Sequence, residues 1–77
     1  MNLHISRYSG KPLYAQLRDE VKRQILDGTF KPGDRIPTEE EICNQYKISR
    51  SVIKQAFTEL VKDGYLERNT RNGTIVK

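Results

Sequence analysis

Three polar side chains, Arg50, Ser51 and Lys54, begin an amphipathic stretch in the C-terminal half of this 77-residue chain. An arginine can pair bidentately with a guanine edge, a lysine can meet guanine or a phosphate, and a serine hydroxyl accepts either partner. All three lie off the apolar stripe that includes Ile53 and Phe57, so a helix would leave them exposed. Their types and spacing therefore predict contacts to DNA bases and phosphates.

The helix that carries these side chains is predicted between Ser49 and Gly64. Ser49 is a candidate N-cap residue, and Gly64 stands where a left-handed residue often ends a helix. The backbone N–H groups at such a helix start also favour a phosphate. The apolar positions, which recur every three or four residues, are Ile53, Ala56, Phe57, Leu60 and Val61.

A second helix is predicted immediately before it. Thr38 can cap its backbone and Glu41 stands three residues later, which is the spacing of a capping box. This helix can extend only to about Tyr46, so Lys47 and Ile48 alone separate the two helices. A connection that short forces the pair to cross at a steep angle, as in a helix-turn-helix.

A first helix is predicted from Pro12, whose missing N–H suits the first helical turn, to Gly28. A turn at residues 32–34 follows it. At the other end of the chain, residues 65–68 and 74–76 indicate two short strands, with Asn72-Gly73 as a tight-turn signal between them. The expected fold is mainly α with a small β-hairpin: a winged helix-turn-helix of three helices and a two-stranded wing.

The charge distribution agrees with an anionic partner. The net charge is +4, and the whole excess lies in residues 47–77, which carry seven bases and three acids. Arg68 and Arg71 stand near or in the hairpin loop, where basic side chains can follow the DNA backbone or enter the minor groove.

Composition argues against an enzyme. The chain has one histidine, His4, and one cysteine, Cys43, so no paired metal site is expected. It has no phosphate-binding Gly-x-x-x-x-Gly-Lys loop, and the acids at 39–41 are better explained by the helix dipole. We expect no catalytic site, metal or cofactor. No apolar run is long enough to span a membrane, and a single cysteine fits a reducing, cytoplasmic setting.

In this order, the residues resemble the GntR family of bacterial repressors and activators from Pro12 to Val76. The start of the match is most similar to the branches whose sensor domains resemble HutC or YtrA. The matching segments are residues 12–17 (PLYAQL), 28–39 (GTFKPGDRIPTE), 48–50 (ISR), 63–66 (DGYL) and 73–76 (GTIV), with Ala56 and Leu60.

The resemblance implies a DNA-binding domain at residues 12–77, preceded by an N-terminal arm at residues 1–11. It also implies a homodimer on a palindromic operator in double-stranded DNA, and repression of transcription. An effector-binding or dimerising domain would follow the wing, and it is absent from this chain. Such a domain would bind the small-molecule effector.

The expected DNA contacts combine this resemblance with the pattern of charges. Arg35, which precedes the helix-turn-helix, is expected either to brace a turn or to contact phosphate. The full set is Arg35, Thr38, Ser49, Arg50, Ser51, Val52, Lys54, Thr70, Arg71 and Gly73.

Several positions depart from the family pattern. Val52 replaces a common threonine, Lys54 a common arginine, and Arg71 the first glycine of a Gly-x-Gly wing. Glu40 stands where the family usually has an arginine that contacts DNA. An acid there repels phosphate, although it can also accept a hydrogen bond from a cytosine amine.

Two other uses of the fold stay open at this stage. A winged helix can bind protein, but a protein-binding face would be more apolar than one that carries Arg50, Lys54 and Arg71. RNA binding would require exposed aromatic side chains for stacking. Tyr14, Tyr46, Phe57 and Tyr65 are instead expected in or at the edge of the core.

Overall fold

The computed structural model describes residues 5–6, 10–69, 71 and 73–77. Three helices, α1 (Leu13–Leu26), α2 (Glu39–Tyr46) and α3 (Arg50–Lys62), precede two strands, β1 (Leu66–Asn69) and β2 (Gly73–Val76). This order confirms the predicted fold class. Among the described residues, no helix has the length and apolar character needed to cross a membrane.

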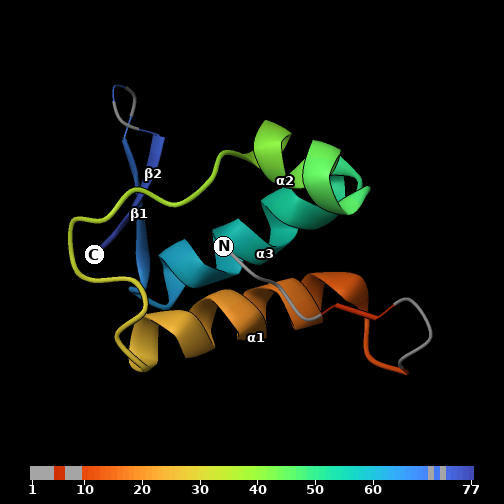
Figure 1. Ribbon diagram of the computed structural model, residues 1–77, viewed down its shortest axis with the longest axis horizontal. Helices are drawn as coiled ribbons and strands as arrows, with labels where there is room; N and C mark the ends of the chain where they lie inside the picture. The colour runs from red at the N-terminus through yellow and green to blue at the C-terminus, as the bar shows by residue number, and fades with distance from the viewer. Residues whose placement is uncertain (1–4, 7–9, 70, 72) are drawn as a thin grey trace.

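The third helix, α3, lies at the centre of the molecule (Figure 1). It packs along α1 on one side, touches α2 near its own beginning and leads into β1 at its end. Four residues of its predicted apolar stripe, Ile53, Ala56, Phe57 and Leu60, are fully enclosed, whereas the fifth, Val61, is half-buried. The other core residues are Leu17, Val21, Ile36, Ile42, Ile48, Leu66 and Val76.

The first helix, α1, begins after Pro12, which takes the N-cap position rather than the first helical turn. Gln16, one turn into α1, is buried and holds the chain that precedes the helix. Its side-chain amide accepts a hydrogen bond from Ser6 N–H at 2.8 Å and donates to Ser6 O at 2.9 Å. Ile5 packs against the core, so the described part of the expected arm folds back onto the domain. His4 lies outside the described residues.

Both strands lie one residue closer to the turn than the sequence predicted, since β1 excludes Tyr65 and ends at Asn69, and β2 begins at Gly73. The pairing of the hairpin runs from Leu66–Val76 to Asn69–Gly73, so only residues 70–72 connect the strands. Gly73 has a φ of 75°, in the left-handed region that favours glycine, and this allows it to be a strand residue directly after the turn. The predicted turn residue Asn72 lies outside the described residues.

The segment between α1 and α2 joins the sheet, which the sequence did not predict. Gly33 N–H donates to Val76 O at 2.8 Å, Val76 N–H donates to Asp34 O at 2.8 Å, and Ile36 N–H donates to Thr74 O at 3.0 Å. The expected turn is present at this place, but the chain leaves it as a partner of β2. The wing is therefore hydrogen-bonded to the segment that leads into the helix-turn-helix.

Candidate nucleic-acid interface

The start of α2 follows the capping pattern in part. Glu41 N–H donates to Thr38 Oγ1 at 3.1 Å, so Thr38 caps the helix as predicted. The return bond differs from a standard capping box, because Glu41 Oε1 accepts from the Thr38 hydroxyl at 3.2 Å. Thr38 is half-buried, and its hydroxyl is hydrogen-bonded to the backbone and the side chain of Glu41.

The turn between α2 and α3 depends on Lys47. Its φ of 57° and ψ of 42° lie in the left-handed region, which reverses the chain direction at the C-cap of α2. Ile48 follows and is buried in the core, so the turn is anchored there. This geometry confirms the short connection and leaves the beginning of α3 at the surface.

The polar face of α3 is exposed as predicted. Arg50, Ser51 and Lys54 are all solvent-exposed, whereas Ile53 and Phe57 on the opposite face are fully buried. Because the buried stripe fixes the rotation of the helix, it also fixes which residues face outward. Val52 differs from its neighbours, since it is half-buried and packs partly against the core.

Ser49 occupies the predicted N-cap position, but its side chain makes no capping hydrogen bond. Its Oγ lies 3.3 Å from Ser51 Oγ instead. The Ile53 N–H donates a hydrogen bond to Ser49 O at the start of α3. The amides of residues 50–52 come before this bond and have no carbonyl partner within the helix. First-turn amides of this kind favour an anion.

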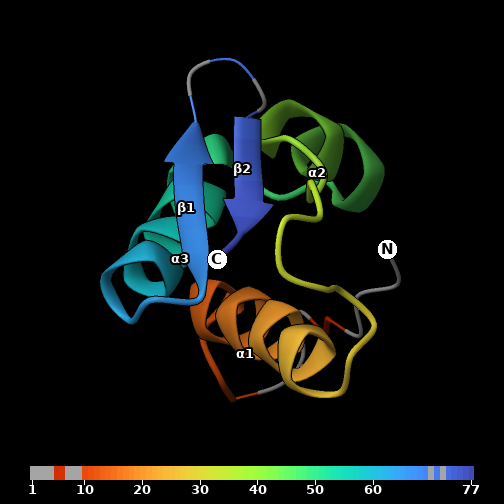
Figure 2. The ribbon, with the colours of Figure 1, turned by 90° about the vertical axis from the view of Figure 1, so that its left-hand side faces the viewer.

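The wing lies on the same side of the molecule as α2, opposite α1 (Figure 2). Arg71 is exposed, and its N–H donates to Asn69 Oδ1 at 2.8 Å. Thr70, another expected contact, lies outside the described residues. The backbone of Arg35 forms an isolated antiparallel β-bridge with Ile75. The Arg35 side chain lies beside Gly73, where its Nε would be 3.8 Å from a Cβ atom added to the glycine. Arg35 therefore lies beside β2 of the wing, with its side chain toward the loop end of the hairpin, while it remains exposed, a place that suits both roles expected of it.

Ion pairs between α2 and its neighbours were missed by the sequence reasoning. Arg50 Nη2 lies 3.9 Å from Glu40 Oε2, and Arg68 Nη2 lies 4.0 Å from Glu39 Oε1. Arg68 also donates to Thr58 Oγ1 at 3.1 Å, which ties β1 to α3. These partners are far apart in the sequence, so no periodicity or motif indicates them.

A different charge pattern surrounds α1. Hydrogen bonds that the Arg18 guanidinium donates to Asp19 and then to Glu59 raise the pKa of Arg18, and the Arg18–Glu59 pair at 2.8 Å links α1 to α3. Hydrogen bonds from Lys11 and then Arg18 lower the pKa of Asp19. The charges here are thus largely satisfied by one another.

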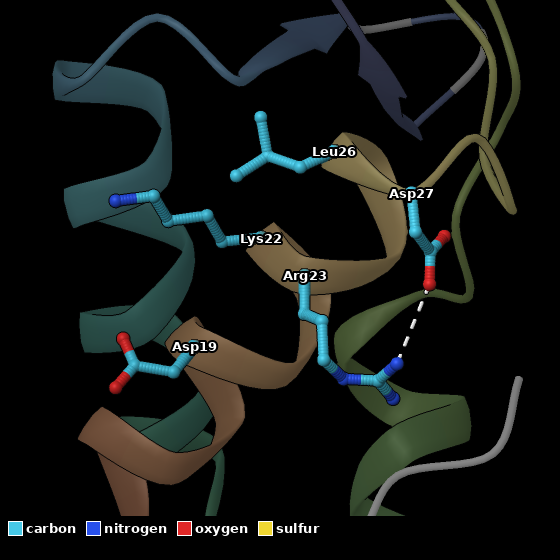
Figure 3. A pocket seen from close by; sticks show the side chains of 5 residues that line it. All are labelled: Asp19, Lys22, Arg23, Leu26 and Asp27. Carbon is cyan, nitrogen blue, oxygen red and sulfur yellow. Dashed lines mark hydrogen bonds and ion pairs between the residues drawn. The ribbon is translucent and has the colours of Figure 1, made fainter.

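A shallow hollow on the surface of α1 does not form a site of this kind (Figure 3). It is lined by one exposed leucine and four side chains of mixed sign, among which Arg23 Nη1 lies 3.3 Å from Asp27 Oδ2. None of the expected DNA contacts lines it. In the described parts of the chain, no group of three or more His, Cys, Asp or Glu residues is placed to hold a metal ion. Cys43 is half-buried at the edge of the core.

Three helices, a three-residue connection between α2 and α3, and a paired hairpin define a winged helix-turn-helix domain, with cationic side chains exposed at the start of its third helix. Residues 13–76 match the family model described as "Bacterial regulatory proteins, gntR family". The chain belongs to this family, which confirms the resemblance found in the sequence.

Individual relatives agree with this assignment. The chain is 44% identical over 71 residues to a probable fructoselysine utilization operon transcriptional repressor of Escherichia coli, covering 92% of the chain and 29% of the relative. It is 45% identical over 65 residues to the arabinose metabolism transcriptional repressor of Geobacillus stearothermophilus, covering 84% of the chain and 18% of the relative. The chain therefore spans less than a third of either relative.

Solved structures share the fold over the whole chain. The AraR DNA-binding domain in complex with operator ORX1 superposes with a TM-score of 0.87 at 32% identity, covering 100% of this chain and 99% of that one. YtrA from Sulfolobus acidocaldarius, a GntR-family transcription factor, gives a TM-score of 0.90 at 27% identity, covering 97% and 79%.

Proposed function

We propose that this chain is the operator-binding domain of a bacterial transcription repressor. The observation that carries the proposal is the exposed face of Arg50, Ser51 and Lys54 at the start of a helix whose opposite face is buried. In helix-turn-helix proteins the N-terminal end of the motif's second helix, which is α3 in this chain, enters the major groove. The solved complexes of AraR domains with their operators support the proposal, as do relatives named as repressors.

Base recognition and positioning fall to different residues in this arrangement. Arg50 and Lys54 contact base edges, since long cationic side chains can reach into the groove and pair with guanine. Ser51 and the exposed edge of Val52 contact bases or sugars beside them. Ser49 lies with the first-turn amides against a phosphate.

The wing follows the adjacent minor groove. Arg71 and Thr70 contact the backbone or the groove, and Gly73 lets the wing approach closely. Arg35, beside β2 of the wing, and Thr38, at the start of α2, contact phosphates on the flank. A single module of this kind buries roughly 600–1,000 Å² of protein surface on DNA.

The relatives named above are much longer than this chain. In the full-length protein, the proposal includes a homodimer on a palindromic operator and an effector site outside residues 12–77. It also includes a cytoplasmic location, where the DNA is. The isolated domain binds weakly, because a lone module lacks the avidity of two linked ones.

An amide chemical-shift titration with a mixed-sequence DNA duplex, at low and at high salt, tests the proposal. Shifts that weaken with salt are expected at residues 49–54 and around residues 69–74. The matched pair of variants is Arg50→Ala and Arg23→Ala, since each removes one exposed arginine and only the first lies on the proposed face. The absence of shifts at low salt would refute DNA binding and point to a protein partner, and shifts confined to α1 would refute the proposed binding face.

A further inference from the structure

Glu40 is placed where it opposes the function proposed for its neighbour. Its carboxylate lies 3.9 Å from the Arg50 guanidinium, and the two side chains are 70% and 65% exposed. An acid in the first turn of a helix complements the helix dipole. That role is already filled on both sides of Glu40, since Glu39 also stands in the first turn and Glu41 completes the cap with Thr38.

The stability of the fold does not explain the pair either. Ion pairs between two exposed side chains contribute little, because water screens them and both side chains lose freedom. Glu40 therefore has a negligible part in holding α2 or α3 in place. Its consequence lies in the electrostatic field at the start of α3.

Glu39 extends the same pattern to the wing. Its carboxylate lies 4.0 Å from Arg68 Nη2, and Arg68 belongs to β1. The first turn of α2 thus places one carboxylate beside an arginine of the helix and another beside an arginine of the hairpin. Both elements are ones that we propose to meet DNA.

We infer that Glu40 is a specificity-determining residue, which restrains Arg50 and repels phosphate so that binding to DNA of arbitrary sequence is weakened. This inference rests on the proposed function. Attraction to phosphates is independent of sequence, so a carboxylate at the interface reduces it for every duplex. Bidentate pairing with a guanine at the correct position can replace the carboxylate as the partner of Arg50, whereas a single phosphate contact replaces it poorly.

The consequence is a larger difference between correct and incorrect sites. Discrimination is a difference of two affinities, and it increases when the weaker complex is penalised more than the stronger one. In a non-cognate complex Arg50 stays paired with Glu40. In the cognate complex Arg50 turns to the base, and the lost ion pair is compensated there.

The test uses Glu40→Gln in this 77-residue chain. Two labelled duplexes serve as probes: one selected by the parent protein from a randomised pool, and one of mixed sequence. Binding is measured by fluorescence anisotropy at several salt concentrations. The matched control is Asp63→Asn, which makes the same change of charge at the C-cap of α3. Asp63 lies about 20 Å along the helix from Arg50, well beyond the roughly 8 Å over which charges act at physiological salt.

In Glu40→Gln, Arg50 is free to make one phosphate contact. We therefore expect the affinity for the mixed-sequence duplex to rise about five-fold at 0.15 M salt, and the slope of log K against log salt to steepen by about 0.9. We expect the selected duplex to gain less, so that the ratio of the two affinities falls. The thermal midpoint should not move, and Asp63→Asn should change neither the slope nor the ratio. A purely structural role for Glu40 would move the midpoint and leave the slope unchanged.

Three results would overturn the inference while the proposed function stands: no change in Glu40→Gln, an equal gain for both duplexes, or a loss of affinity for the selected duplex. The last would assign Glu40 to direct contact with a cytosine amine. If the parent chain bound neither duplex at low salt, the proposed function itself would fail.

Discussion

The cations of α1 and those at the start of α3 differ in what surrounds them. On α1, Arg18 pairs with Asp19 and Glu59, and Arg23 pairs with Glu20 and Asp27, at distances between 2.8 and 3.3 Å. At the start of α3, Arg50 meets one carboxylate at 3.9 Å. Within the described residues, Lys54 has no acidic group at ion-pair distance.

This contrast shows that the position of a basic residue matters less than its local compensation. A cation with close acidic partners serves the fold, because its charge is already balanced. A cation without such partners keeps its field available to an external anion. Counting bases along the chain gives only the excess in residues 47–77 and does not separate these two uses.

Replacing Arg50 gives the largest expected effect on function. Arg50→Ala should weaken binding to the selected duplex by about 1–3 kcal/mol and relax specificity at one base pair. Its stability should stay close to that of the parent, because the side chain is exposed. Anisotropy titrations over single-base variants of the duplex measure both effects, and an unchanged affinity would remove Arg50 from the interface.

Replacing Arg18 should show the opposite behaviour. Arg18→Met keeps most of the apolar stem and removes the link between α1 and α3, so the free energy of unfolding should fall by about 1 kcal/mol. In a domain of this size that corresponds to about 4–8 °C in the thermal midpoint. DNA affinity measured well below the midpoint should not change. A variant as stable as the parent, or one impaired in DNA binding, would break the division between the two regions.

The smallest expected effect is the pH-dependent loss of stability in Asp19→Asn. Because neighbouring cations lower the pKa of Asp19 in the folded state, its ionised form adds stability above the ordinary aspartate pKa. That stability is lost as the pH falls through the lowered folded pKa. Thermal midpoints of Asp19→Asn and the parent should therefore differ near neutral pH, and the difference should shrink as the pH falls below the ordinary aspartate pKa of about 3.9. Parallel curves at every pH would show that the ionisation of Asp19 does not support the fold.

Local signals predicted the elements well. The apolar stripe of α3 fixed its buried face, and Thr38 with Glu41 located the start of α2, because caps and helical periodicity act within a few residues. Gly64 and Gly28 both have φ values of 87°, as helix-ending glycines commonly do. The order of helices and hairpin followed from these signals.

Contacts between distant segments could not be predicted in the same way. The pairing of residues 33–36 with β2 and the link between Arg18 and Glu59 depend on how the elements pack. The Glu40–Arg50 pair likewise forms only because α2 and α3 cross closely. The DNA contacts expected of individual residues remain predictions.

The hydrogen bonds between residues 33–36 and β2 have a consequence for DNA shape. They join the wing to the entrance of the helix-turn-helix, so a change in spacing between wing and α3 would require breaking backbone bonds at Gly33, Ile36 and Val76. On the proposed function, the wing and α3 therefore meet the duplex at a nearly fixed spacing. Where the grooves of an operator do not match that spacing, the duplex must bend or narrow to fit, and sequences that deform easily gain affinity at base pairs that no side chain touches.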